Sequence, residues 1–269
     1  MSTKPSSIVD VLRQIANVVA IPFGIAASYL AVQLTGKDVG SVSRANEPLL
    51  AAAGWTFAIW GVIFLGQLVY AVYQALPSKR SSNVLRRIGW LTALSSVLTG
   101  AWVLVFNTER FVAAWGIMLA ILVTLVAIEI RRGDSSRRGP ELLLVRVPYS
   151  LNLGWIAVAT ILETSQVLDR VYHWNGGPLS PESWGVVMVA VATALAAMMI
   201  TLRPNLGFGV AVAWGLAGVF HYEQTHARMI SGAALLGVIA IAVLLVVEIV
   251  LLATRGLKPA LRHQRTSVV

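Results

Sequence analysis

The chain has 269 residues, of which 57% are hydrophobic and only 12% charged, and its mean hydropathy is +0.75. Because about a quarter of the residues in a soluble domain are charged, this composition excludes a soluble protein and predicts an integral membrane protein. There is no cysteine, which excludes disulfides and thiolate metal sites. The net charge of +9 comes from short basic clusters between apolar runs, so it indicates contact with a lipid bilayer and not with nucleic acid.

Eight apolar segments are long enough to cross the hydrocarbon core, which takes about 20 helical residues. The seventh is short and rich in glycine. We therefore predict an all-α membrane protein with eight transmembrane helices. In chain order they are Val11–Leu34, Ala51–Leu76, Ile88–Phe106, Phe111–Ile130, Val145–Leu168, Trp184–Leu202, Leu206–Phe220 and Met229–Thr254.

The distribution of Lys and Arg supports an even number of crossings. With eight helices, sixteen of the 21 basic residues fall on one side of the membrane. Cytoplasmic loops hold the excess of positive charge, so both termini are predicted to be cytoplasmic in a multi-pass protein of a bacterial inner membrane. The chain divides into a five-helix bundle (1–170), three additional helices (171–254) and a basic cytoplasmic tail (255–269). The five basic residues on the other side are Lys37, Arg44, Arg110, Arg170 and Arg228.

Polar and aromatic residues follow one face of the second predicted helix. Trp60, Gln67, Tyr70 and Gln74 are separated by seven, three and four residues, which places them on one side of a helix with 3.6 residues per turn. Polar groups inside a membrane span are costly and often functional. This face is therefore a candidate wall of a binding site.

The fifth predicted helix carries a similar face. Tyr149, Asn152, Trp155 and Glu163 lie within about 60° of Asn152 when projected down the helix axis. If the two faces meet, they line an apolar cavity with a few polar anchors, as in many small-molecule sites. The alternative is that the aromatic residues are interfacial anchors and the amides join neighbouring helices.

Glu163 is the single residue that most clearly suggests a functional role. It lies near the outer end of the fifth helix, where it could bind a cationic or hydrogen-bonding ligand or take up a proton. It could equally reach lipid headgroups or pair with Arg170. A metal site is not predicted, because His221 and His226 are five residues apart and project about 140° from each other on a helix.

Three segments resemble the translocator protein family, also called tryptophan-rich sensory proteins or TspO/MBR. "GWTFAIWGVIF" is similar to the signature that opens the family's second helix, with Ala53 where proline is usual. "GAWVLVF" resembles its third-helix tryptophan segment and "GWIAVATILE" its fifth-helix segment. The resemblance covers Val11 to Arg170, and we interpret the chain as a long bacterial form with three further helices. The matching positions are Gly54, Trp55, Phe57, Trp102, Trp155, Ala159, Thr160 and Leu162.

The resemblance implies a five-helix bundle with a pocket that opens toward the first loop. It implies tetrapyrroles, such as a porphyrin or haem-like molecule, or sterol- or isoprenoid-like lipids as ligands. Trp55, Phe57, Trp102 and Trp155 become pocket residues, and Trp60 and Tyr149 join them with shifted positions. Glu163 stands where the family typically has asparagine, which would change the charge preferred in a ligand.

These observations predict a protein that binds a hydrophobic small molecule for sensing, sequestration or transport. Two alternatives belong to other classes. One is a membrane enzyme that acts on a lipid or isoprenoid with Glu163 as acid or base. The other is a structural subunit whose three additional helices dock on another membrane protein, or a homodimer. The predicted ligand-binding residues are Trp55, Phe57, Trp60, Gln67, Tyr70, Trp102, Tyr149, Asn152, Trp155 and Glu163.

Overall fold

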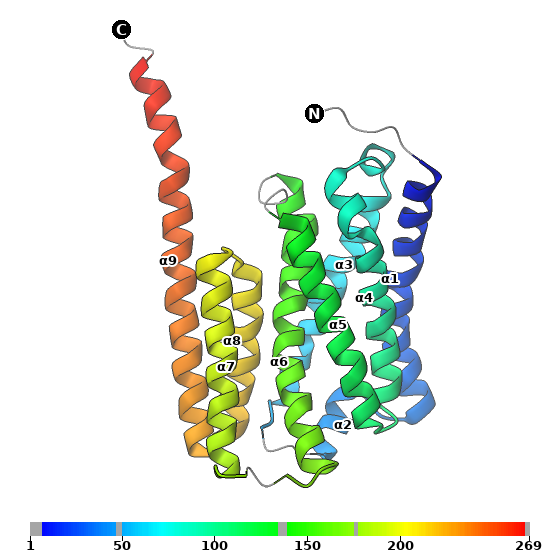
Figure 1. Cartoon of the computed structure of the whole chain (residues 1–269), viewed down its shortest axis with the longest axis vertical. Coiled ribbons are helices and arrows are strands. Elements are labelled where there is room, and N and C mark those ends of the chain that lie inside the picture. Colours follow the sequence, from blue (N-terminus) through cyan, green and yellow to red (C-terminus); the bar gives the residue numbers. More distant parts are fainter. Residues whose placement is uncertain (1–6, 47–49, 134–138, 175–176, 267–269) are drawn as a thin grey trace.

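The structure is a computed structural model of the whole chain, and it describes residues 7–46, 50–133, 139–174 and 177–266. These residues form helices and connecting turns, with no strand among them. The long helices run alongside one another (Figure 1). They are α1 (Ile8–Thr35), α2 (Val39–Ala45), the 3₁₀ turn η1 (Gly54–Ala58) leading into α3 (Ile59–Ala75), α4 (Asn83–Phe106), α5 (Phe111–Arg132), a π turn (Leu142–Arg146) leading into α6 (Val147–Arg170), α7 (Pro181–Leu202), α8 (Leu206–Glu223) and α9 (Arg228–Thr266).

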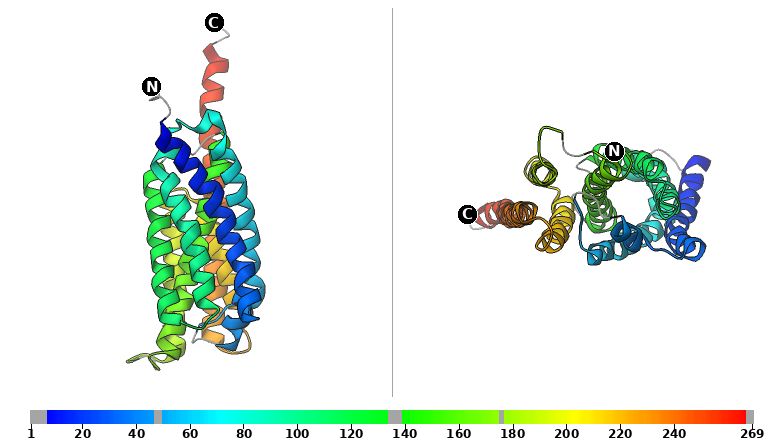
Figure 2. Two further views of the ribbon diagram at one scale, coloured as in Figure 1. Left: turned by 90° about the vertical axis from the view of Figure 1, so that its right-hand side faces the viewer. Right: turned by 90° about the horizontal axis from the view of Figure 1, so that it is seen from below.

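Five helices close into a ring, and three pack beside it. Around the ring, α1 contacts α4, α4 contacts α5, α5 contacts α6, α6 contacts α3 and α3 contacts α1. The end-on view in Figure 2 shows this ring, with the remaining helices on one side. The helix α8 joins the two groups, because it packs against α6 on one side and against α7 and α9 on the other. The predicted all-α arrangement of five helices plus three is confirmed.

Seven helices in the described part of the chain are long and apolar enough to span a membrane. The helix α8 is not among them, because its last residues, His221–Glu223, are polar and lower the mean hydropathy of its 18 residues. It nevertheless runs alongside α7 and α9 (Figure 1). The protein is therefore a multi-pass membrane protein, and eight crossings fit its geometry.

The beginning of α1 and the end of α9 lie at the same end of the molecule (Figure 1). The turns between α3 and α4 and between α7 and α8 lie at that end too, which agrees with the sorting of basic residues in the sequence. Lys4, Arg137 and Arg138, which contributed to that sorting, lie outside the described residues. That this end is cytoplasmic stays a prediction.

Two segments differ from expectation. The loop between the predicted helices Val11–Leu34 and Ala51–Leu76, for which no helix was predicted, contains α2, whose N-cap Asp38 accepts a hydrogen bond from the backbone N of Ser41 (3.0 Å). A helix this short and polar leaves no apolar period in the sequence. The predicted basic tail begins as a continuation of α9, which runs to Thr266 and not to Thr254. Extending a formed helix adds one hydrogen bond per residue, whereas starting one is costly.

Small residues let the helices approach closely where the site is built. A side chain on Gly154 of α6 would place its Cβ only 2.5 Å from the backbone O of Phe208 in α8. On Gly218 of α8, it would lie 1.9 Å from Thr56 Cγ2 in η1. Such contacts are typical of membrane helices, where packing replaces the hydrophobic effect. They hold α8 against both α6 and the start of the second crossing.

Candidate functional site: an aromatic chamber beneath the first loop

A small chamber lies inside the five-helix ring, at the end where α2 is found (Figure 1). Its volume is about 40 Å³, which is room for roughly three water molecules at 10–15 Å³ each. Its walls come from η1, α3, α4, α5 and α6, and its roof comes from α2 and the segment that follows. The lining residues are Val39, Ser43, Leu50, Ala51, Ala52, Phe57, Trp60, Trp102, Phe106, Met118, Trp155, Ala159, Leu162, Glu163 and Gln166.

The local structure of two helices explains which side chains face the chamber. On α6, Trp155, Ala159, Glu163 and Gln166 recur every three or four residues and thus share one face. Near the roof, the chain enters α3 through a 3₁₀ turn, which has three residues per turn. Phe57 and Trp60 are three residues apart across this turn and both reach the chamber. The 3₁₀ turn at Gly54–Ala58 therefore determines which aromatic side chains of this segment face the chamber.

Five aromatic rings form a continuous cluster around the chamber. The ring centres of Trp60 and Trp102 are 6.3 Å apart with planes at 30°, and Trp102 stacks on Phe106 at 5.0 Å. Trp155 meets Trp60 edge-on at 6.3 Å and Phe57 edge-on at 5.9 Å. Aromatic pairs in such geometries contribute about 0.5–1.5 kcal/mol beyond the area they bury. The cluster is thus a preformed apolar wall contributed by three crossings.

Glu163 brings a carboxyl group into this apolar wall. Its side chain is buried, and both carboxyl oxygens accept the indole N–H of Trp102, at 3.2 and 3.1 Å. The ion pair with Arg170 considered from the sequence is not formed, because Arg170 pairs with Asp169 at 3.4 Å. Next to this group, Trp115 donates its indole N–H to Thr164 (2.9 Å). Glu163 therefore belongs to the chamber and not to the membrane surface.

The roof of the chamber is attached to α8. The backbone N of Ala51 donates to Glu223 Oε1 (3.1 Å), and the backbone N of Ala53 donates to the carbonyl of Gly218 (3.0 Å). The indole N–H of Trp214 donates to the carbonyl of Thr56 (2.8 Å). One of the three additional helices therefore holds the segment that closes the chamber.

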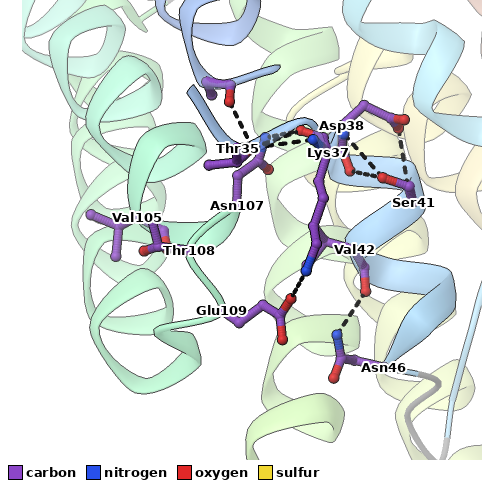
Figure 3. A network of polar contacts seen from close by, with 11 residues as sticks. Thr35, Lys37, Asp38, Ser41, Val42, Asn46, Val105, Asn107, Thr108 and Glu109 are labelled. Atoms are coloured by element: carbon purple, nitrogen blue, oxygen red, sulfur yellow. Dashed lines mark hydrogen bonds and ion pairs between the residues drawn. The ribbon is translucent and has the colours of Figure 1, made fainter. Parts of the chain in front are cut away.

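A second attachment joins the roof to the turn between α4 and α5, as Figure 3 shows. Asn107 Nδ2 donates to the carbonyl of Lys37 (2.7 Å), and Lys37 forms an ion pair with Glu109. Asn107 is buried, whereas Lys37 and Glu109 are exposed. The roof is thus fixed at its beginning by the ring and at its end by α8.

Neutralising the exposed ion pair is expected to change stability little. Surface ion pairs contribute about 0–1 kcal/mol because water screens them and ordering long side chains costs entropy. We expect Glu109→Gln to shift the midpoint of thermal unfolding by no more than a few degrees, as measured by intrinsic fluorescence in detergent. Asn107→Ala, which leaves the Lys37 carbonyl without its buried donor, is expected to shift it further; the opposite ranking would contradict this assignment.

The structure brings five of the ten predicted site residues together in the chamber: Phe57, Trp60, Trp102, Trp155 and Glu163. Trp55 lies outside it, on the α8 side, where it meets Trp214 edge-on at 4.8 Å and remains 43% exposed. The remaining four, Gln67, Tyr70, Tyr149 and Asn152, are buried but are not part of its lining.

These four residues occupy the ring interior farther along α3 and α6. Tyr70 and Tyr149 meet edge-on at 5.0 Å, so the two predicted faces do contact each other. Tyr70 shares a hydrogen bond with Thr92 (3.0 Å). Gln74, from the same stripe, exchanges side-chain-to-backbone hydrogen bonds with Gln14 of α1 (3.0 and 2.6 Å), which is helix-joining of the kind weighed as the alternative. The predicted polar and aromatic face of α3 therefore has two roles: Gln74 joins α3 to α1, and Trp60 lines the chamber.

Sequence reasoning missed the residues of the roof, and it also missed two residues of the walls, Phe106 and Gln166. Gln166 is three residues beyond Glu163 on the same face of α6, so its spacing could have identified it. Its Nε2 donates to the carbonyl of Asn46 (3.3 Å). The alanines and Leu50 of the roof have no chemical signature, and only the folded chain places them over the aromatic wall.

A larger cavity of about 550 Å³ lies between α5, α6 and α7. Its lining is mostly aliphatic and includes Leu122, Leu153, Val191 and Met199. Its polar lining residues are Glu129, Thr160 and Arg203, and it contains none of the predicted site residues. We assign the candidate site to the smaller chamber, because the predicted aromatic residues and Glu163 come together there.

Comparison with known families gives one match: the sequence model of the TSPO-like protein family fits residues 14–247. No curated protein and no solved structure matches the chain. The matched region extends past Arg170, where the motif resemblance ended, and takes in α7, α8 and the membrane part of α9. The chain therefore belongs to the TSPO-like protein family.

Proposed function

We propose that this protein binds a hydrophobic small molecule in the aromatic chamber, for sensing, sequestration or transport. The observation that carries the proposal is the convergence of Phe57, Trp60, Trp102 and Trp155 with one carboxyl group, that of Glu163, around one small cavity. Such a cavity, apolar with few polar anchors, is the usual form of a small-molecule site. Under the predicted orientation, the chamber lies near the outer face of a bacterial inner membrane.

The chamber is too small for a large ligand. Sites for drug-sized molecules have volumes of about 300–1,000 Å³, against about 40 Å³ here. A tetrapyrrole, which the family resemblance implies, would enter only if the roof segment 50–53 moved away from α8. The roof is held by few hydrogen bonds, so binding coupled to its opening is consistent with the structure.

Titration with protoporphyrin IX while tryptophan fluorescence is recorded tests the proposal. We expect saturable quenching that weakens at least tenfold in Trp155→Leu, because the indole is buried at the centre of the aromatic cluster. Trp90→Leu is the matched control, since Trp90 is 48% exposed on α4 and does not line the chamber. The tetrapyrrole proposal would be overturned if no quenching occurred, or if neither Trp155→Leu nor Trp90→Leu changed the affinity.

A further inference from the structure

We propose that the chamber selects amphipathic organic cations, with the positively charged nitrogen held between Glu163 and the tryptophan side chains that line the same cavity. This inference rests on the proposed function, because it names the chemical class that the same chamber would take. It combines three features: an uncompensated acid, a set of aromatic faces around it, and a cavity of limited size.

The first feature is the charge balance at Glu163. The carboxyl group is only 4% exposed, and its hydrogen bonds come from one neutral donor, the Trp102 indole. No Lys, Arg or His of the described residues forms an ion pair with it, and the residues that line the chamber include no basic side chain. A buried carboxylate is costly unless it is paired. A cationic ligand would supply the partner that the fold omits.

The second feature is the aromatic wall. Indole and phenyl faces attract cations through their quadrupoles, and tryptophan does so most strongly. Trp60, Trp102 and Trp155 surround the same cavity as the Glu163 carboxyl. Aromatic rings around a carboxylate recognise alkylated ammonium groups. These cations are weakly hydrated, so leaving water costs them little free energy.

The third feature is size. The cavity of about 40 Å³ accommodates a compact head such as a methylated ammonium group without a large opening of the roof. The roof residues Leu50, Ala51 and Ala52 are apolar. They would contact the hydrophobic part of the ligand. A ligand that also carries carboxylates would have to keep them away from Glu163, on the side of the chamber's opening.

A matched pair of probes tests the inference. Benzyltrimethylammonium carries a positive nitrogen, and neopentylbenzene has the same shape with carbon in its place. Binding is measured by isothermal titration calorimetry with the full-length protein in nanodiscs, with empty nanodiscs subtracted for partitioning. We expect the cation to bind at least tenfold more tightly than the isostere, and Glu163→Gln to remove most of that preference while leaving the isostere unaffected.

Three variants make the result specific. Gln at position 163 can still accept the Trp102 hydrogen bond, so the variant is expected to fold, and its thermal midpoint checks this. Glu163→Asp retains the negative charge and is expected to retain the preference for the cation. Glu182→Gln is the control, because it removes a partly exposed acid of α7 that touches neither the chamber nor its roof.

Three outcomes overturn the inference in distinguishable ways. If the isostere binds as tightly as the cation, and both bind more weakly in Trp155→Leu, the cation preference fails but the chamber remains a binding site. If neither probe binds and protoporphyrin quenching is also absent, the proposed function fails with it. Retained selectivity in Glu163→Gln would likewise remove the carboxylate from the explanation.

Discussion

Replacing Gly154 with alanine is expected to destabilise the protein by about 1–3 kcal/mol, the usual cost of overpacking a close contact. The added Cβ would lie 2.5 Å from the backbone O of Phe208 and 2.9 Å from Ala211 Cβ. Neither is the flexible end of a side chain, so α6 and α8 must move apart. Because α8 holds the roof, the change should also loosen the chamber.

The matched control is Gly116→Ala on α5. A Cβ at Gly116 meets nothing within 4 Å, and alanine favours a helix over glycine by up to about 1 kcal/mol. We expect a lower thermal midpoint for Gly154→Ala and an unchanged or higher one for Gly116→Ala, measured in one detergent at one scan rate. Equal midpoints would show that α6 and α8 do not pack as described.

Removing the carboxylate of Glu223 is expected to release the roof of the chamber. In Glu223→Ala the backbone N of Ala51 loses its acceptor, and an unsatisfied buried donor costs about 1–3 kcal/mol. This cost destabilises the closed position of the roof relative to an open one. The amides around Ala51 should therefore exchange with deuterium about 5 to 150 times faster, as measured by mass spectrometry of the peptide covering residues 50–57.

Glu182→Ala is the control for this experiment. Glu182 Oε1 accepts the backbone N of Met229 (2.9 Å), so the lost bond is of the same kind. That bond is exposed and joins α7 to α9 away from the chamber. Exchange at 50–57 should therefore match the wild type in Glu182→Ala; an increase in both variants, or in neither, would refute the role assigned to Glu223.

The fold could be predicted from the sequence because membrane insertion depends on length and apolarity, which local composition records. All eight predicted crossings appear as helices, including α8, whose predicted segment, Leu206–Phe220, was short and rich in glycine. The short helix α2 could not be predicted, because its formation depends on the Asp38 cap and on attachment to Asn107 and Glu109.

The site was predictable in part for a physical reason. Helical periodicity identifies residues that share a face, so it grouped Trp155 with Glu163 correctly. It carries no information about depth along that face. Tyr149 and Asn152 therefore appeared equivalent to Trp155, although they lie outside the chamber lining. The roof was beyond reach, because Ala51 and Glu223 are 172 residues apart in sequence.

The attachment of the roof to α8 has a consequence for biosynthesis. Chains emerge from the ribosome N-terminus first, and early parts fold before later ones exist. The ring formed by α1 and α3–α6 is complete once Arg170 has entered the membrane, whereas Gly218 and Glu223 are translated some fifty residues later. During that interval the roof lacks its hydrogen bonds to α8. A ligand can then enter the nascent ring before α8 holds the roof in place.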